Sequence, residues 1–516
     1  KLLPGVAAMP SPRARPAAGR SLLGRGCPVM ILFCLLPGLL PPAAATAAEF
    51  TALGHWMFGL NAGNVYGQKR ADVRDHFQAV QRLRTQFGFV TSPSLDGQIQ
   101  LEMGKTNWGQ ASSGGALGAD AALTKLRHAW LDWRVPGSGT SVRMGLQPVN
   151  MPSFVNGSPL FSEDAAAIVV SQELHKRLDV TAFWVRASAS NEDPGREGLP
   201  GFNEMDFFGL SLPARGDAFR VTPYAMFAEA GVNSFGSRAR SGSGWSLAPY
   251  KSSLRTVAAN LTPVGGTRLL ADPRASRQLA PWGTAWWGGI GGDANPVARW
   301  RLAGEVAFGS ADFGSLTTRG RSFAMRRAGW YGAFLAEYRQ DRMTPGLLGW
   351  YSSGDDGDPR NGSERMPVGK SANRDWKVLN LAYDGAPFCP DGGAQIISPN
   401  GTMIGTWGLV GFLKDITFPE DLRHTVRVGY VRGSNDPAMV TADPFFTDAS
   451  PGGYLTRKDE ALEVDLETRL QLYENLTLIL DADWLRVNWD SDVWKRFGDR
   501  LVQDFYRVGL TAYYHF

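Results

Sequence analysis

The stretch Tyr506–Phe516, YRVGLTAYYHF, decides the fold class. Its even-numbered positions read Tyr506, Val508, Leu510, Ala512, Tyr514 and Phe516, whereas its odd-numbered positions read Arg507, Gly509, Thr511, Tyr513 and His515. Successive side chains of a β-strand point to opposite faces. One face of this segment is therefore apolar and ends in aromatic residues, and the other is mostly polar, which predicts a strand between an apolar and a wet environment.

The hairpin that precedes this strand repeats the alternation with stronger charges. Leu462, Val464 and Leu466 alternate with Glu463, Asp465 and Glu467, and beyond the Glu474-Asn475 turn the leucines of 476–484 alternate with Asp481 and Asp483. Charged side chains on one face of a strand cost little free energy where water reaches that face. In a large membrane barrel the wet face lines the lumen and the apolar face meets lipid. In the alternative, a secreted soluble β protein, the apolar faces would be buried inside.

Similar segments continue towards the N-terminus, and eighteen strands are predicted in all. The predicted strands are 50–59, 80–90, 95–104, 125–135, 140–147, 166–175, 178–188, 203–212, 218–229, 281–291, 298–309, 326–338, 344–352, 404–417, 423–433, 462–472, 476–484 and 506–516. Short connections such as 91–94 and 176–177 alternate with long ones such as 148–165 and 353–403. This predicts an all-β fold, a transmembrane antiparallel up-and-down β-barrel of 18 strands, with short periplasmic turns and long extracellular loops. Sixteen strands remains the alternative count.

Composition favours the barrel over a set of soluble domains. The 516 residues include 61 Gly, 27 Phe, 17 Trp and 13 Tyr, but hydrophobic residues make up only 43%. No segment after the N-terminal region offers the 18 consecutive apolar residues of a membrane-spanning helix. A closed barrel is the other structure that satisfies its backbone hydrogen bonds in lipid, so the prediction is a bacterial outer-membrane protein.

The first 48 residues are predicted to be a secretory signal peptide and leader, which leaves residues 49–516 as a single barrel domain. They contain five basic residues and no acid, an apolar run at 29–40, and the small residues AAATAA at 43–48. Without them the 53 basic residues fall to 48, against 49 acidic residues, so the mature chain has no general attraction to nucleic acid. Cys389 is then the single cysteine, which excludes an intrachain disulfide.

Several segments resemble the outer-membrane homotrimeric porins of sulfate-reducing bacteria. They are the leader, FTALGHWMFGLNAGN at 50–64, YSSGDDGDPRNGSERMP at 351–367 and the final YRVGLTAYYHF. The resemblance implies a Gram-negative outer-membrane homotrimer in contact with lipid and lipopolysaccharide, in which each barrel allows passive diffusion of small hydrophilic solutes and ions. The final strand also resembles the recognition signal for barrel assembly, carried here by Tyr506, Val508, Leu510, Tyr514 and Phe516.

The same resemblance implies that the third long loop, residues 148–165, folds inward and narrows the pore. That loop contains Glu163 and Asp164. The strand phases turn Arg82 and Arg84, and then His128 and Arg134, towards the lumen. We therefore expect acids on the loop to face these basic side chains across a water-filled gap. The alternative is that Arg82 and Arg84 are ordinary solvated residues and that Glu163 and Asp164 cap the loop.

Other functional classes find less support in the sequence. Asp355, Asp356, Asp358 and Glu364 offer oxygen ligands for Ca²⁺, but their spacing is not that of an EF-hand, and a solvated acidic turn is favoured. No common catalytic motif is present, so the chain is predicted not to be an enzyme and to need no cofactor. A sugar-specific channel, the main alternative, would need lumenal aromatics, for which Trp286, Trp287 and Tyr331 are candidates. A barrel enzyme would need a Ser/His/acid group at one rim.

Overall fold

The computed structural model describes most of the chain after the predicted leader. It describes residues 49–65, 76–118, 124–189, 204–232, 234, 237–241, 244–248, 252–272, 274–371, 376–388, 396–397, 402–443, 447, 449–498 and 501–516. The second of the chain's two units is Thr46–Phe516. The predicted signal peptide lies outside the described residues. Among the described helices, none has the length and apolar character needed to cross a membrane.

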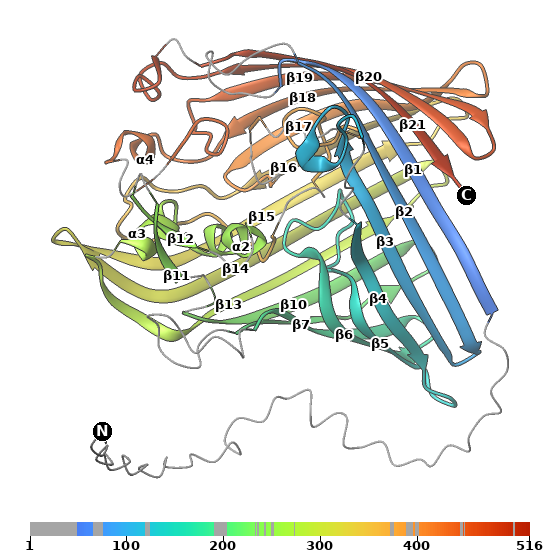
Figure 1. Ribbon diagram of the computed structural model, residues 1–516, viewed down its shortest axis with the longest axis horizontal. Coiled ribbons are helices and arrows are strands. Elements are labelled where there is room, and N and C mark those ends of the chain that lie inside the picture. Colours follow the sequence, from blue (N-terminus) through green and yellow to red (C-terminus); the bar gives the residue numbers. More distant parts are fainter. Residues whose placement is uncertain are drawn as a thin grey trace, which may run out of the picture. The chain divides into compact units, whose positions relative to one another are not determined.

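One antiparallel sheet dominates the second unit (Figure 1). Its strands are β1 (Glu49–Gly63), β2 (His76–Ser92), β3 (Leu95–Asn107), β4 (Thr124–Arg134), β5 (Thr140–Asn150), β6 (Ser162–His175), β7 (Leu178–Ser188), β8 (Met205–Ser211), β9 (Ala214–Arg215), β10 (Phe219–Gly231), β13 (Ser276–Ala294), β14 (Trp300–Thr318), β15 (Arg321–Tyr338), β16 (Thr344–Ser352), β17 (Thr406–Thr417), β18 (Leu422–Gly433), β19 (Glu460–Tyr473), β20 (Leu476–Asn488) and β21 (Asp504–His515). The remaining elements are η1 (Ala111–Ser113), the β11 (Ser237–Ser241) and β12 (Gly244–Ala248) pair, α2 (Ser252–Leu261), α3 (Gly266–Ala271) and α4 (Ala438–Thr441).

The sheet closes on itself because the first strand pairs with the last. β1 pairs with β21 from His55↔His515 to Gly63↔Arg507, and Figure 1 shows the blue and red strands side by side. β8 and β9 both pair between β7 and β10, so they share one position in the barrel. Eighteen strand positions result in the described part of the chain, which confirms the predicted all-β barrel.

The two faces of the strands lie as the alternation predicts. On β19, Leu462 and Leu466 point outward and are 41% and 45% exposed, whereas Glu463 and Asp465 between them point inward and are 1% and 0% exposed. An apolar outer surface on a closed, even-numbered barrel is the architecture of bacterial outer-membrane proteins. The protein is therefore an outer-membrane barrel with its charged strand faces directed to the lumen.

The lumen is narrowed by more than the single inward loop that the sequence predicted. Two connections enter it: the third loop (residues 151–161, between β5 and β6) and the 353–405 loop (between β16 and β17). Their side chains form much of a continuous buried core inside the barrel. Buried members of these loops are Leu160, Phe161, Met366, Val368, Trp376, Leu379, Leu381 and Tyr383. The alternation along strands gives no information about where apolar loop residues pack, so the sequence did not predict this core.

Candidate functional site

The third loop crosses the lumen and is held on the inner face of β14. The Phe154 backbone N–H and the Ser153 hydroxyl donate to the carboxylate of Glu305, at 2.7 and 3.1 Å. The Arg301 guanidinium in turn donates to the Phe154 carbonyl at 2.9 Å. Glu305 is 6% exposed, while its outward neighbour Val306 is 46% exposed. The loop therefore folds inward, as the resemblance implied.

The 353–405 loop crosses the lumen in a second direction. Its Leu381 and Ala382 N–H groups donate to the Glu463 carboxylate on β19, at 2.6 and 2.9 Å. Further along, the ring of Phe388 lies 5.2 Å from the Arg82 guanidinium on β2. Near its start, the Pro367 carbonyl accepts from the Trp287 indole on β13 at 2.7 Å. The loop thus contacts three separate parts of the inner wall.

The two loops also contact each other inside the barrel. The Lys370 ammonium donates to the Ser158 carbonyl at 2.6 Å, and the Gly369 N–H donates to the Leu160 carbonyl at 3.0 Å. The Ser371 N–H donates to the Glu163 carboxylate at 2.5 Å. Together, the two loops narrow the lumen.

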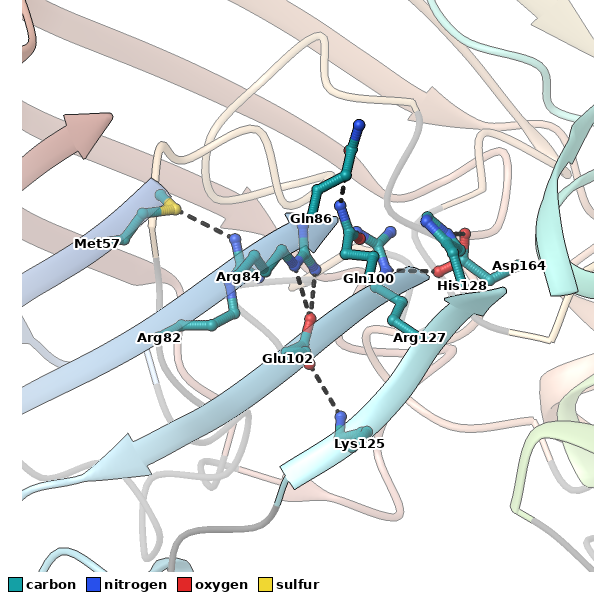
Figure 2. A network of polar contacts seen from close by, with 10 residues as sticks. All are labelled: Met57, Arg82, Arg84, Gln86, Gln100, Glu102, Lys125, Arg127, His128 and Asp164. Atoms are coloured by element: carbon teal, nitrogen blue, oxygen red, sulfur yellow. Dashed lines mark hydrogen bonds and ion pairs between the residues drawn. The ribbon is translucent and has the colours of Figure 1, made fainter. Parts of the chain in front are cut away.

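Four of the six predicted pore residues lie in one polar network on the wall formed by β2, β3, β4 and β6, shown in Figure 2. Arg84 pairs with Glu102 at 2.6 Å, and His128 contacts Asp164 at 2.8 Å. Arg82, the third predicted basic residue, donates to the sulfur of Met57 at 3.1 Å. The strand phases therefore predicted correctly which of these side chains turn inward.

The other two predicted residues, Glu163 and Arg134, lie outside this network. The prediction that Glu163 and Asp164 belong to the third loop was wrong. β6 begins at Ser162, so Glu163 and Asp164 belong to a strand and not to the loop. Glu163 contacts the 353–405 loop and Asp164 contacts β4, so Asp164 touches its basic partners directly without a gap. Arg134 lies outside the network, where it pairs with Asp96 at 2.8 Å near the turn between β2 and β3.

Three charged residues of the network were missed by the sequence reasoning: Glu102, Lys125 and Arg127. Glu102 pairs with both Arg84 and Lys125, and Arg127 pairs with Asp164 at 2.7 Å. The register between β3 and β4 shifts between Gln100 and Leu101, which lets both Arg127 and His128 reach inward. Strict alternation would have placed Arg127 outside. The inward orientation of Glu102 could have been predicted, because it alternates with the apolar residues of 95–104.

A cavity of about 430 Å³ lies between the two loops and the inner face of β14 to β19. The third loop contributes Val155 and Asn156, and the 353–405 loop contributes Lys377 and Val378. Six cationic side chains line it: Arg301, Lys377, Lys414, Arg423, Arg427 and Arg469. Three acidic side chains accompany them: Glu337, Asp415 and Glu467. The cavity is therefore polar and carries an excess of positive charge.

Neither a family model nor a curated protein sequence matches the chain. Among solved structures it is similar to Acinetobacter baumannii OccAB3, with 10% identity over 91% of this chain and 99% of that chain and a TM-score of 0.48. It is also similar to Pseudomonas aeruginosa OpdK with vanillate (12% identity, 90% and 98% covered, TM-score 0.47) and P. aeruginosa OprD (13%, 92% and 97%, 0.46). These likenesses concern the fold alone.

The candidate Ca²⁺ ligands point to separate partners. Asp355 accepts from Ser363 and Tyr454, Asp356 accepts from Asn361, and Asp358 pairs with Arg360 at 3.0 Å. The Arg360 guanidinium holds the pKa of Asp358 below its usual value, and burial raises the pKa of Glu364. Within the described residues no group of His, Cys, Asp and Glu has a metal-binding arrangement. This loop has the contacts of a structural turn.

The aromatic residues considered for sugar stacking do not form a ladder. Trp286 points outward and is 50% exposed, whereas Trp287 and Tyr331 point inward but are 1% and 0% exposed. Tyr331 donates its hydroxyl to Glu305 at 3.1 Å, beneath the third loop. These two rings therefore support the loops.

The side chains of the predicted assembly signal form the outer face of β21. Tyr506, Val508 and Leu510 are 42%, 48% and 40% exposed. Beyond the strand, the Phe516 backbone exchanges two hydrogen bonds with Gly54 of β1, at 2.8 and 3.1 Å. The final residues thus complete the closure of the barrel, and their role in recognition by an assembly machinery stays a prediction.

Proposed function

We propose that the protein is an outer-membrane channel for small hydrophilic solutes and ions, and that it passes anions in preference to cations. One observation carries the proposal: the cavity between the two inward loops and the wall is lined by six cationic and three acidic side chains. Some of these charges neutralise one another in ion pairs. Glu337 pairs with Arg301 at 3.3 Å, and Arg469 pairs with Glu467 at 2.6 Å. Lys377, Arg423 and Arg427 add positive charge to the same space.

A positive field inside a narrow passage favours anions for two reasons. Low-dielectric walls focus the field, which raises the local anion concentration. Rings of basic side chains in a pore also lower the barrier for anions relative to cations. The narrowing of the lumen by two loops favours a charge-selective passage over a wide, non-specific pore. The buried positions of Trp287 and Tyr331 make the sugar-specific alternative less favoured. The proposal assigns no catalytic step to the chain.

Planar-bilayer recordings in a salt gradient test this function. The purified protein should form channels whose reversal potential reports anion preference. Arg423→Glu should move the reversal potential towards cation preference, because it reverses a charge on the cavity wall. Arg177→Glu, in the turn between β6 and β7, is the matched control and should leave selectivity unchanged. A protein without conductance, or an Arg423 variant with unchanged selectivity, would contradict the proposal.

We further propose that the channel assembles as a homotrimer in contact with lipopolysaccharide. The support is the resemblance of the opening strand, the 351–367 loop and the final strand to homotrimeric porins. Stepwise conductance increments in groups of three would agree with this assembly, and single increments from a monodisperse monomer would not.

A further inference from the structure

The inner face of β19 and β20 carries five buried carboxyl groups, which we call the acidic wall. Their residues are between 0% and 4% exposed: Glu463, Asp465, Glu467, Asp481 and Asp483. Among the described residues, three guanidinium groups face them from β18, β19 and β21: Arg427, Arg469 and Arg507. If all of these groups were charged, two negative charges would remain without a cation in a buried position. Such charge is costly unless a cation pairs with it or a proton removes it.

Two pairs of these carboxyl groups are placed to share a proton. Glu463 and Asp465 lie two residues apart on β19, and their side chains hydrogen-bond to each other. Asp481 and Asp483 make the same kind of contact on β20. An ionised carboxylate only accepts hydrogen bonds, so each contact requires a proton on one of its two partners. Two protons would also remove the two surplus negative charges of the acidic wall.

Residues 376–388 of the inserted loop cover the acidic wall with uncharged donors. The Asn380 backbone N–H donates to Asp465 at 3.2 Å, and the Asn380 side-chain amide donates to Asp483 at 2.7 Å. Two further backbone N–H groups of this segment donate to Glu463. None of these donors is a cation, so the cover satisfies the carboxyl oxygens without neutralising the surplus charge.

The titratable side chains of residues 376–388 do not change this balance. Lys377 and Asp384 carry opposite charges, and the Tyr383 hydroxyl hydrogen-bonds with the side chain of the first residue of β17 at 3.0 Å. Beside the acidic wall, the Leu379 side chain packs on Gly429 of β18, where a Cβ would approach it to 2.6 Å. Apolar and neutral polar groups therefore keep water from the wall.

We infer that the acidic wall and residues 376–388 form a proton-operated latch, which holds the segment in the lumen at low pH and releases it as the pH rises. While the segment covers the wall, the wall keeps its two shared protons. Carboxyl groups in contact with water are ionised near neutral pH, so the released state binds fewer protons. For each proton by which the two states differ, their ratio changes about tenfold per pH unit. This inference concerns the inserted loop, and it rests on the proposed channel function only where conductance is measured.

Amide hydrogen exchange of the folded wild-type protein in detergent tests the latch directly. The exchange rates of the Leu381 and Ala382 N–H groups are divided by the intrinsic rates at each pH to give their protection. This protection should fall, by up to about tenfold per pH unit for each proton released, between about pH 6 and about pH 9. The Gly369 N–H of the same loop is the matched control, because it donates to the Leu160 carbonyl, which does not titrate. Protection at Leu381 and Ala382 that does not change with pH would overturn the inference.

Neutral variants test whether the acidic wall is the origin of the pH response. Glu463→Gln combined with Asp465→Asn keeps oxygen acceptors for the loop but has no proton to lose, so its protection should stay high throughout the pH range. Glu420→Gln, in the exposed turn between β17 and β18, is the matched control and should respond as the wild-type protein does. Heat-modifiable migration shows that each barrel is folded. A folded double variant with the wild-type pH response would contradict the latch, and if the double variant does not fold, the wild-type exchange decides.

Single-channel conductance separates the latch from the channel function. Wild-type conductance should rise over the same pH range, because the released segment no longer narrows the lumen, and the double variant should lose this rise. A protein that does not conduct, but whose protection falls with pH, keeps the latch and contradicts only the channel function. A conducting protein whose protection does not depend on pH contradicts only the latch.

Discussion

The inner wall of β2–β4 and the inner wall of β19–β21 carry charged side chains in the same alternating pattern, but their surroundings differ. On the first wall the side chains of Lys125 and Arg127 are 57% and 27% exposed. On the second, the side chains of Arg507 and Asp481, which pair at 2.6 Å, are both 0% exposed. The charged side chains of the first wall are partly exposed, whereas those of the second are buried beneath the 353–405 loop.

The difference follows from what covers each wall. Glu463 accepts hydrogen bonds from two backbone N–H groups of the inserted loop, and Asp483 accepts from the amide of Asn380 at 2.7 Å. These donors replace water, so the two carboxylates keep hydrogen-bond partners although they are buried. A charged strand face therefore indicates that the face points inward, but it does not show that the face is wet.

Removing the buried arginine should have the largest effect. Arg507→Leu leaves Asp481 and Asp483 without their cation in a position that water does not reach, which costs about 3–5 kcal/mol of unfolding free energy. Urea unfolding of the refolded barrel, followed by tryptophan fluorescence, measures the loss. Arg127→Leu on the exposed wall should cost about 0–1 kcal/mol, since its pair with Asp164 is partly solvated. Equal losses of unfolding free energy for the two variants would contradict the proposed difference between the walls.

Releasing the loop from the acidic wall should have the next largest effect. Glu463→Ala removes the acceptor of two buried N–H groups and should cost about 2–3 kcal/mol. The loop should then become a site of limited proteolysis and single-channel conductance should rise, because the loop no longer narrows the lumen. Glu420→Ala, in the exposed turn between β17 and β18, controls for the loss of one negative charge. Unchanged proteolysis and conductance would show that other contacts hold the loop.

Adjacent residues on β6 sharpen the comparison, because Glu163 faces the covered part of the lumen and Asp164 faces the exposed wall. Glu163→Lys should loosen the contact with Ser371 and raise conductance. Asp164→Lys should move the reversal potential towards anions and change the unfolding free energy by about 1 kcal/mol or less. The two variants serve as controls for each other. If both change selectivity alike and neither changes conductance, the division of roles is wrong.

The smallest effects are expected at the acidic turn of the 353–405 loop. Burial raises the pKa of Glu364, so its stabilising contribution is present below its usual value of 4.5 and is lost as the pH rises through the folded-state pKa. Arg360 lowers the pKa of Asp358, so that contribution is present above its usual value of 3.8 and is lost as the pH falls. Glu364→Gln should therefore raise the melting temperature slightly at pH 7. Asp358→Asn should lower it slightly at the same pH, because the exposed pair with Arg360 is lost.

Calcium provides the control for that turn, because the four carboxylates make separate contacts. Millimolar Ca²⁺ should leave the melting temperatures of the wild-type protein and of Asp356→Asn unchanged. A Ca²⁺-dependent increase that Asp356→Asn abolishes would restore the metal site considered from the sequence.

Local alternation was sufficient to predict most of the fold. It located the strand β7 at 178–188 and β16 at 344–352 with the same bounds as the structure has. It placed Arg82, Arg84 and His128 on the inner face as well. It failed where the period of two is interrupted, as at the shift that turns Arg127 inward, and where a loop contact defines the environment, as for Glu163.

By itself, the sequence determined a closed barrel with an apolar outside, because a strand's side-chain period is a local property that each segment of the chain carries independently. Only the tertiary structure decided which charged faces meet water and which loops enter the lumen. These features depend on contacts between residues that are far apart in the chain, such as Lys370 with Ser158 and Leu381 with Glu463. No local pattern records such contacts, since the partner of each group is set by how the whole barrel closes.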